Sequence, residues 1–304
     1  MKHRRELTVV QVDAFTDVPF GGNPAAVILG ADRVNEETML KIAREMNVRE
    51  TVFVSSSKVA DFKFRFMTPK TELAFSGHPT VAAFHALTRE GHVEVVDDVA
   101  MFSLETKAGV LEVEIVKNET TGRNEVQIFH QRPQFMRTYD PRVYAEALGL
   151  TLADVLSPNP IQTVSTGTPH LMVPITTMRA MERIEPDWNR LKELREDADY
   201  VSIQVFSRET LEVTSDAHAR HFAPALGIYE DPVSGSGAGA MGSYMVKQGI
   251  MDSTNRVTSI VIEQGQFVGR PGKVFVEVIG DQDEIQQVKV SGTAVRTLRG
   301  TLYI

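Results

Sequence analysis

The amino-acid sequence predicts an α+β fold of two pseudo-symmetric halves, each a curled mixed sheet around a central helix. Two observations lead to this prediction. Strand patterns dominate the chain, with helices of about a dozen residues between them. One motif also occurs twice, at residues 66–83 and 222–240, and each copy runs from an aromatic-proline turn through an acidic residue to a small-residue loop that opens a helix. One large α+β domain with a chance similarity is the alternative, but the common order of elements favours duplication.

The elements of the first half follow from periodicity and turn residues. Segments rich in β-branched or alternating apolar residues predict strands at residues 7–15, 24–29, 51–55, 61–66 and, as two or three strands, 95–115. Asn35 is expected to cap a helix that reaches about Asn47 and has apolar residues on one face. The first motif opens a second helix, residues 80–90, which Gly91 stops.

The second half has a similar order of elements. Strand patterns lie within residues 163–175 and at 200–206, 211–214, 257–263 and 273–279, and residues 218–222 lead into the second motif. Asp187 is expected to cap a helix over residues 188–195, and the helix of the second motif ends within 241–249. The halves are joined within residues 117–160, where 118–124 form a polar hairpin or loop and Asp140-Pro141 starts a helix.

Composition excludes several classes of function. The net charge of −8 gives no global attraction to nucleic acid or to an anionic membrane, so an anionic substrate needs local dipoles to hold it. The absence of cysteine excludes disulfides, thiolate zinc sites and cysteine acid–base chemistry. No apolar run has the length of a membrane span, and the N-terminal segment lacks a signal-peptide core, so we expect a cytoplasmic protein.

The two helix-opening loops are candidate anion sites. Helix N-termini present unpaired N–H groups and partial positive charge, and two of them aimed at one point would suit an anion. In the first loop Gly77, beside Ser76, is expected to adopt a conformation closed to other residues and to admit a ligand. His78 could transfer a proton or hydrogen-bond a substrate, although it could equally be a capping or surface residue.

The second loop, Asp231-Pro232-Val233-Ser234-Gly235-Ser236-Gly237, offers backbone N–H groups and hydroxyls to a carboxylate or phosphate. It is not a Walker A loop, because no Lys follows at the required spacing, and neither serine has the glycines of a nucleophile elbow. The simpler interpretation is a helix cap made by Ser234 or Ser236.

Glu50 is the third candidate, because it immediately precedes an apolar strand. Burial there would favour the protonated acid, which suits a general acid/base. A charge paired with Arg49 or Arg65, or a solvated strand end, is the simpler interpretation. The other histidines show no metal spacing: His218 and His221 lack a supporting carboxylate cluster, and His85 is expected to pack.

At these residues the chain resembles the PhzF family of phenazine biosynthesis-like isomerases. The resemblance is carried by five stretches: residues 12–16 with 22–27, 47–53, 68–80, 230–236 and 269–271. It implies a diaminopimelate epimerase-like fold, in which residues 1–130 plus 293–304 form the N-terminal half and 131–292 the C-terminal half. The active site would lie in the cleft between them.

The resemblance also implies roles for individual residues. Glu50 would be the acid/base that moves a proton on a small unsaturated or cyclic carboxylate similar to trans-2,3-dihydro-3-hydroxyanthranilate, without metal or cofactor. His78 and Asp231 would assist. Binding of the substrate carboxylate would involve both helix-opening loops, through Ser76, Gly77, Ser234, Gly235 and Ser236. The family also suggests a homodimer.

Two features of the sequence bear on the chemistry. Related racemases and epimerases use one cysteine in each half, at loops where Ser76 and Ser234 stand here, and a hydroxyl is too weak an acid for that exchange. Arg49 stands where the phenazine enzymes commonly have a small serine, and its guanidinium would either favour the ionised form of Glu50 or bind a second acidic group of the substrate. A non-catalytic carboxylate-binding protein, and a lyase or epimerase using Glu50 with Asp231, remain alternatives.

Overall fold

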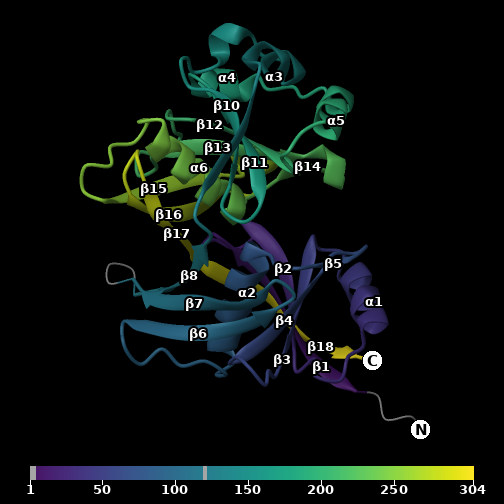
Figure 1. The fold of residues 1–304 in the computed structure, drawn as a ribbon. Coiled ribbons are helices and arrows are strands. Elements are labelled where there is room, and N and C mark those ends of the chain that lie inside the picture. Colours follow the sequence, from purple (N-terminus) through teal and green to yellow (C-terminus); the bar gives the residue numbers. More distant parts are fainter. Residues whose placement is uncertain (1–4, 119–121) are drawn as a thin grey trace. The chain divides into compact units, whose positions relative to one another are not determined.

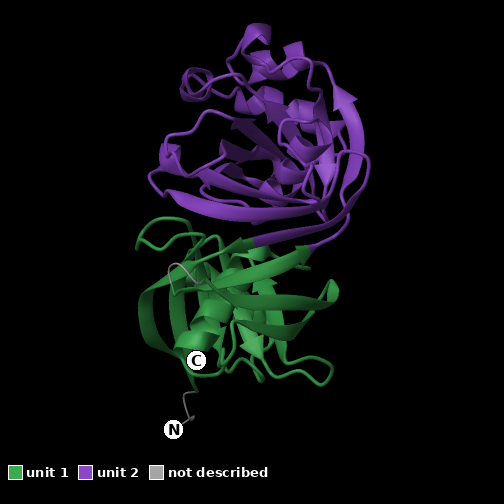
Figure 2. Ribbon diagram, turned by 90° about the vertical axis from the view of Figure 1, so that its left-hand side faces the viewer, with its two compact units in different colours: residues 1–129, 291–304 green, residues 130–290 purple. Residues whose placement is uncertain are grey.

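The computed structural model describes residues 5–118 and 122–304, and these form two compact units. Unit 1 contains Met1–Phe129 and Ser291–Ile304, and unit 2 contains His130–Val290 (Figure 2). The chain therefore leaves unit 1 once and returns to it with its last strand. No helix in the described part of the chain is long and apolar enough to cross a membrane.

Unit 1 is a mixed sheet with two helices (Figure 1). Its strands are β1 (Glu6–Ala14), β2 (Asn23–Leu29), β3 (Glu50–Ser55), β4 (Phe62–Met67), β5 (Glu72–Leu73), β6 (Val99–Thr106), β7 (Gly109–Lys117), β8 (Asn124–His130) and β18 (Ala294–Tyr303). Its helices are α1 (Glu36–Met46) and α2 (Gly77–Arg89). Asn35 caps α1 as expected, because its side chain accepts a hydrogen bond from the Thr38 N–H.

The strands of unit 1 follow one another in a continuous ladder. β18 pairs antiparallel with β1, β1 antiparallel with β2, and β2 parallel with β3. β3 pairs antiparallel with β4, and β4 pairs parallel with β6, while the short strand β5 lies beside β4. β6 pairs antiparallel with β7, and β7 pairs antiparallel with β8. Helix α2 connects β5 to β6 and packs against β1, β2, β3 and β18.

Unit 2 is built from a similar set of elements. Its strands are β9 (Gln134–Tyr139), β10 (Ile161–Ser165), β11 (Pro169–Pro174), β12 (Ser202–Ser207), β13 (Ala217–Ala223), β14 (Ile228–Asp231), β15 (Val257–Gln264), β16 (Gly272–Gly280) and β17 (Ile285–Gly292). Its α-helices are α3 (Pro141–Ala147), α4 (Met178–Glu182), α5 (Trp188–Glu196) and α6 (Gly235–Lys247). Short 3-10 turns occur at η1 (Leu152–Asp154), η2 (Pro224–Leu226) and η3 (Gln266–Val268).

The strand pairing of unit 2 repeats that of unit 1. β9–β10 and β10–β11 are antiparallel, β11–β12 is parallel, and β12–β13 is antiparallel. β14 lies beside β13, and β13 pairs parallel with β15 after the crossover through α6. The same sequence of antiparallel and parallel neighbours, with a motif helix at the same crossover, confirms the predicted duplication.

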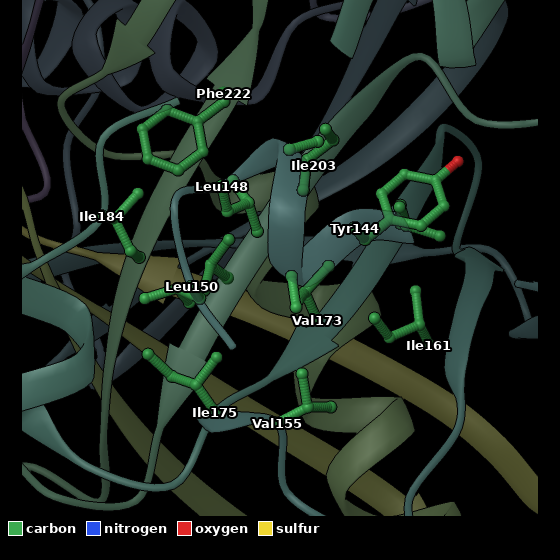
Figure 3. Close-up of a cluster of buried hydrophobic side chains, with 14 of the residues drawn as sticks. Tyr144, Leu148, Leu150, Val155, Ile161, Val173, Ile175, Ile184, Ile203 and Phe222 are labelled. Carbon is green, nitrogen blue, oxygen red and sulfur yellow. The ribbon is translucent and has the colours of Figure 1, made fainter. Parts of the chain in front are cut away.

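Each unit has an apolar core around its helices. In unit 1, α1 buries Met39, Ile42 and Ala43 against strand residues that include Ile28 and Phe53. In unit 2, a larger cluster joins the outer helices to β11, β12 and β13, and it includes Val155, Ile175 and Phe222 (Figure 3). Asp140 and Asp187 cap α3 and α5 as expected.

One predicted strand is wrong. Residues 211–214 form bends and turns, because the N–H groups of Leu211 and Glu212 donate to the carboxylate of Glu263 instead of to a neighbouring strand. The predicted loop at 118–124 lies partly outside the described residues.

The unit 2 core gives a test of this packing. Ile175→Ala should lower the free energy of unfolding by about 2–5 kcal/mol, because the side chain is fully enclosed in the cluster. Trp188, the only tryptophan of the chain, packs against the same cluster, so its fluorescence in a urea titration reports on unit 2. The exposed Leu211, changed to Ala, serves as control and should shift the result by less than about 0.5 kcal/mol. Similar losses in both variants would contradict the assigned core.

Candidate functional site

Glu50 is buried at the start of a central strand. It is the first residue of β3, its backbone lies opposite Ala25 of the parallel strand β2, and only 6% of its surface is exposed. The interpretation as a solvated strand end is therefore wrong. Arg65 binds Glu36 and Glu72 instead, whereas Arg49 Nε lies 3.9 Å from Glu50 Oε1.

His78 lies in the same unit and close to the same arginine. It is the second residue of α2, is 7% exposed, and its Nε2 has no hydrogen-bond partner among the residues that the structure describes. Burial, and secondarily the charge of Arg49, hold the pKa of His78 well below its usual value. The ring is therefore neutral near pH 7 and has one nitrogen able to accept a proton or a hydrogen bond. The charge of Arg49 therefore acts on both His78 and Glu50.

The N-terminus of α2 is open to a ligand. Ser76 occupies the cap position, but its side chain makes no capping hydrogen bond, so the amides of the first turn keep their donor capacity. Gly77 does not have a positive φ, which corrects the conformational reason expected for a glycine here. A Cβ at this position would meet no atom within 4 Å. What the glycine provides is free space beside the helix start.

Asp231 ends the strand that leads to the second loop. It is the last residue of β14, lies opposite His221 of β13, and is 5% exposed. Its carbonyl oxygen accepts a hydrogen bond of 2.9 Å from Gln264 Nε2. The backbone at Asp231 is therefore fixed by a side chain from β15.

The second loop caps its own helix. Ser234 Oγ accepts a hydrogen bond of 3.1 Å from the Gly237 N–H and lies 3.4 Å from Ser236 Oγ. Gly235 is the first residue of α6, and Gly235 and Ser234 are both buried. The capping role proposed as the simpler interpretation is thus present for Ser234. Ser236 Oγ and the N–H groups of the first turn other than that of Gly237 are the donors that this loop offers to an anion.

A buried polar network supports this loop, and no local sequence pattern predicts it. Gln204 Oε1 accepts a hydrogen bond from His221 Nδ1 at 2.6 Å, and Gln204 Nε2 donates to Gln264 Oε1 at 3.4 Å. Gln264 continues the network to the Asp231 carbonyl. A Cβ on Gly237 would lie 2.5 Å from Gln204 Oε1, so α6 begins in direct contact with this network. Of the side chains in this network, only His221 is singled out by the sequence, which predicts no metal site for it.

His218 and His221 have separate partners although they are close in sequence. His218 Nδ1 lies 2.8 Å from Glu263 Oε1, in a fully buried pair. Burial lowers the pKa of His218 below its usual value. Burial opposes ionisation of Glu263, but hydrogen bonds from the Leu211 N–H and from His218 leave its pKa lowered overall. On a strand, residues three apart point to opposite faces, so these histidines do not form one site.

Known proteins of one family are similar to this chain over nearly its whole length. The family described as "Phenazine biosynthesis-like protein" (PhzC-PhzF) matches residues 12–300. An uncharacterized isomerase, YfhB of Bacillus subtilis, is 37% identical over 293 residues, covering 96% of this chain and 97% of that protein. The crystal structure of a PhzF-family phenazine biosynthesis protein from Bacillus anthracis has a TM-score of 0.89 at 34% identity, covering 99% and 100% of the two chains.

A more distant structure shares the fold alone. A hydroxyproline epimerase from Agrobacterium vitis has a TM-score of 0.64 at 11% identity, covering 100% of this chain and 94% of that one. The α+β fold of two similar halves, predicted from the repeated motif, is confirmed by these likenesses.

The two loop glycines should respond differently to Ala. Gly77→Ala should change the free energy of unfolding by less than about 1 kcal/mol, because a methyl group meets no neighbouring atom. Gly237→Ala should cost about 1–3 kcal/mol, because the methyl group overlaps Gln204 and His221. Urea titrations of the two variants provide the measurement. A loss for Gly77→Ala as large as that for Gly237→Ala would show that the space at Gly77 is occupied.

The ring of His78 should stay neutral far into the acid range. In NMR titrations of labelled histidine, Arg49→Gln should raise the pKa of His78 but leave it below the usual value of 6.5, because burial is the larger cause. Arg33→Gln, at an exposed arginine of the same unit, is the matched control and should leave this pKa unchanged. An unaltered His78 titration in Arg49→Gln would remove the link between the two residues.

Proposed function

The chain belongs to the PhzC/PhzF family of phenazine biosynthesis-like proteins, and on this basis we propose that it is a cofactor-independent isomerase that moves a proton on a small carboxylate. Glu50 is the general acid/base. His78 and Asp231 assist it, and the two helix-opening loops bind the substrate carboxylate.

The observation that carries the proposal is the group Glu50, Arg49 and His78 within unit 1. The carboxyl group of Glu50, which is 6% exposed, and the neutral imidazole of His78 both lie near the guanidinium of Arg49, and both can accept a proton. Glu50 as carboxylate can take a proton from one carbon of the substrate and return it, as carboxylic acid, to another carbon. This sequence leaves the composition of the substrate and the charge of the enzyme unchanged, so it needs no co-reactant.

The first turn of α2 supplies donors for the anion. A helix N-terminus contributes about 0.3–1 kcal/mol toward a negative charge at an exposed position, and more where water is excluded. The side chain of Ser76 does not cap the helix, and there is free space at Gly77, so a carboxylate can reach these N–H groups. We propose that Ser234, Gly235 and Ser236 at the start of α6 bind the same substrate molecule. The arginine at position 49 would favour a substrate with a second acidic group.

The substrate class follows from this chemistry. A proton can be removed from carbon by a carboxylate only where the resulting charge is delocalised, as in an unsaturated or cyclic amino acid similar to trans-2,3-dihydro-3-hydroxyanthranilate. A lyase or an epimerase would need a second acid/base, for which Asp231 is the candidate, whereas a simple binding protein has no use for the buried Glu50. We expect the protein to act as a homodimer, which light scattering would test.

Exchange of substrate hydrogen with solvent tests the proposal. When the enzyme acts on dihydro-hydroxyanthranilate or a panel of other unsaturated amino acids in heavy water, deuterium should enter carbon. Glu50→Gln should lower the rate about 10²–10⁴-fold, since it removes the proton carrier and keeps the shape of the side chain. Mass spectrometry measures the incorporation, and NMR identifies the product as isomer, epimer or elimination product.

Glu45→Gln is the matched control, because Glu45 is an exposed glutamate five residues upstream and the chemical change is the same. It should retain the wild-type rate. Incorporation that persists in Glu50→Gln, or tight binding of the panel with no exchange in the wild type, would remove Glu50 from its catalytic role.

A further inference from the structure

Unit 1 contains a cavity that no part of the proposed reaction uses. It has a volume of about 630 Å³ and lies beside the C-terminal part of α2, between the start of β18 and the β7–β8 hairpin. These elements can be followed in Figure 1. The residues that matter for its chemistry are His85 and Arg89 of α2, Asn124 of β8, Arg296 of β18, and Asp17 and Thr293 from the adjoining loops.

Positive charge dominates this cavity. Three arginines line it, Arg89, Arg123 and Arg296, against one carboxylate, Asp17. Arg123 and Asp17 form an ion pair. Arg296 is bound at 3.0 Å by Glu90, but that carboxylate also binds Arg299 at 2.9 Å. In a chain with a net charge of −8, this is a local excess of cations that favours an anion.

Several hydrogen-bond donors around the cavity have no partner within the described part of the protein. Among the described residues, the side chains of Arg89, Asn124 and Thr293 have no hydrogen-bond or ion-pair partner. His85 is half-buried between two cations: burial, then Arg89 and Arg296, lower its pKa to about 4. An anion beside Arg89 and Arg296 would reverse part of that effect, because it offsets the two charges that disfavour the imidazolium.

We propose that this cavity, hereafter the α2–β18 cavity, binds a small dianion such as a phosphate monoester or a dicarboxylate. Guanidinium groups bind phosphate and carboxylate oxygens through two parallel N–H···O bonds, and two arginines on one cavity match a charge of −2. Asn124 and Thr293 add neutral donors. Ile115 and Val126 line the apolar part of the wall, which suits an organic group attached to the anion. The size lies within the range of small-molecule sites.

The test follows the ring signals of His85 by NMR during titration with inorganic phosphate and, separately, with succinate, at constant ionic strength. His85→Asn assigns the signals. At neutral to slightly basic pH, where succinate and most of the phosphate are dianions, at least one of the two anions should shift these signals saturably. Arg89→Gln and Arg296→Gln should each weaken binding about tenfold, as expected for loss of one charge-assisted contact.

Arg33→Gln is the matched control. Arg33 is an exposed arginine of the same unit that does not line the cavity, so its loss should change the affinity less than about twofold. Glu50→Gln should bind the anion like the wild type, which separates this site from the proposed isomerase. The absence of a saturable shift with either anion would overturn the proposal, and so would equal weakening by Arg33→Gln and Arg89→Gln. Circular dichroism confirms that each variant is folded.

Discussion

In each unit, the fold depends on a helix that is enclosed by a curled sheet. This helix must therefore have small side chains where it faces the strands. The constraint is clearest for α6, where a Cβ on Gly237, Gly239 or Gly242 would lie 2.5–2.7 Å from side-chain atoms of the surrounding sheet. Such separations are closer than carbon atoms approach in packed proteins, so a larger residue at these positions would force the neighbouring side chains to move. In α2 the same condition is met by fully buried alanines, Ala82, Ala83 and Ala86.

This enclosure determines where chemistry can occur. A helix surrounded by strands has few backbone groups facing outward except at its ends, and its N-terminus carries the unpaired N–H groups. In both units, the chain reaches that end through a short strand beside a longer one: β5 beside β4, and β14 beside β13. The small-residue loops at Ser76 and Ser234 are thus the places where each unit can present backbone donors to a ligand.

Local signals explain what could be predicted from the sequence. Asn35, Asp140 and Asp187 act as helix caps because a cap is made by one side chain and the next few amides, and the repeated motif similarly contains its own turn, loop and helix start. Non-local contacts explain what could not. Gln204 and Gln264 are 60 residues apart, and their hydrogen bond depends on the pairing of strands through β13.

The same reason accounts for the errors. The segment at Leu211 and Glu212 has the composition of a strand, but its amides bind a carboxylate that lies about 50 residues later in the sequence. The burial of Glu50 also depends on neighbours from other strands. One glutamate beside an apolar segment is compatible with a buried carboxyl group, an ion pair or a solvated strand end, and the parallel pairing of β2 with β3 is what encloses it.

Duplication gave the two units the same framework but different loops, and the difference bears on how the proposed reaction is divided. At α2 the cap hydroxyl of Ser76 makes no capping bond, and a buried neutral His78 and Glu50 lie near a shared arginine. At α6 the cap hydroxyl of Ser234 is already bound to the helix, and the loop is held in place by Gln264 and Gln204.

A fixed loop suits the binding of a charge that does not change during the reaction. A buried carboxyl group and a neutral imidazole near one arginine suit the transfer of a proton. In the proposed reaction, therefore, Glu50 of unit 1 carries the proton, and the N-terminus of α6 binds the substrate carboxylate.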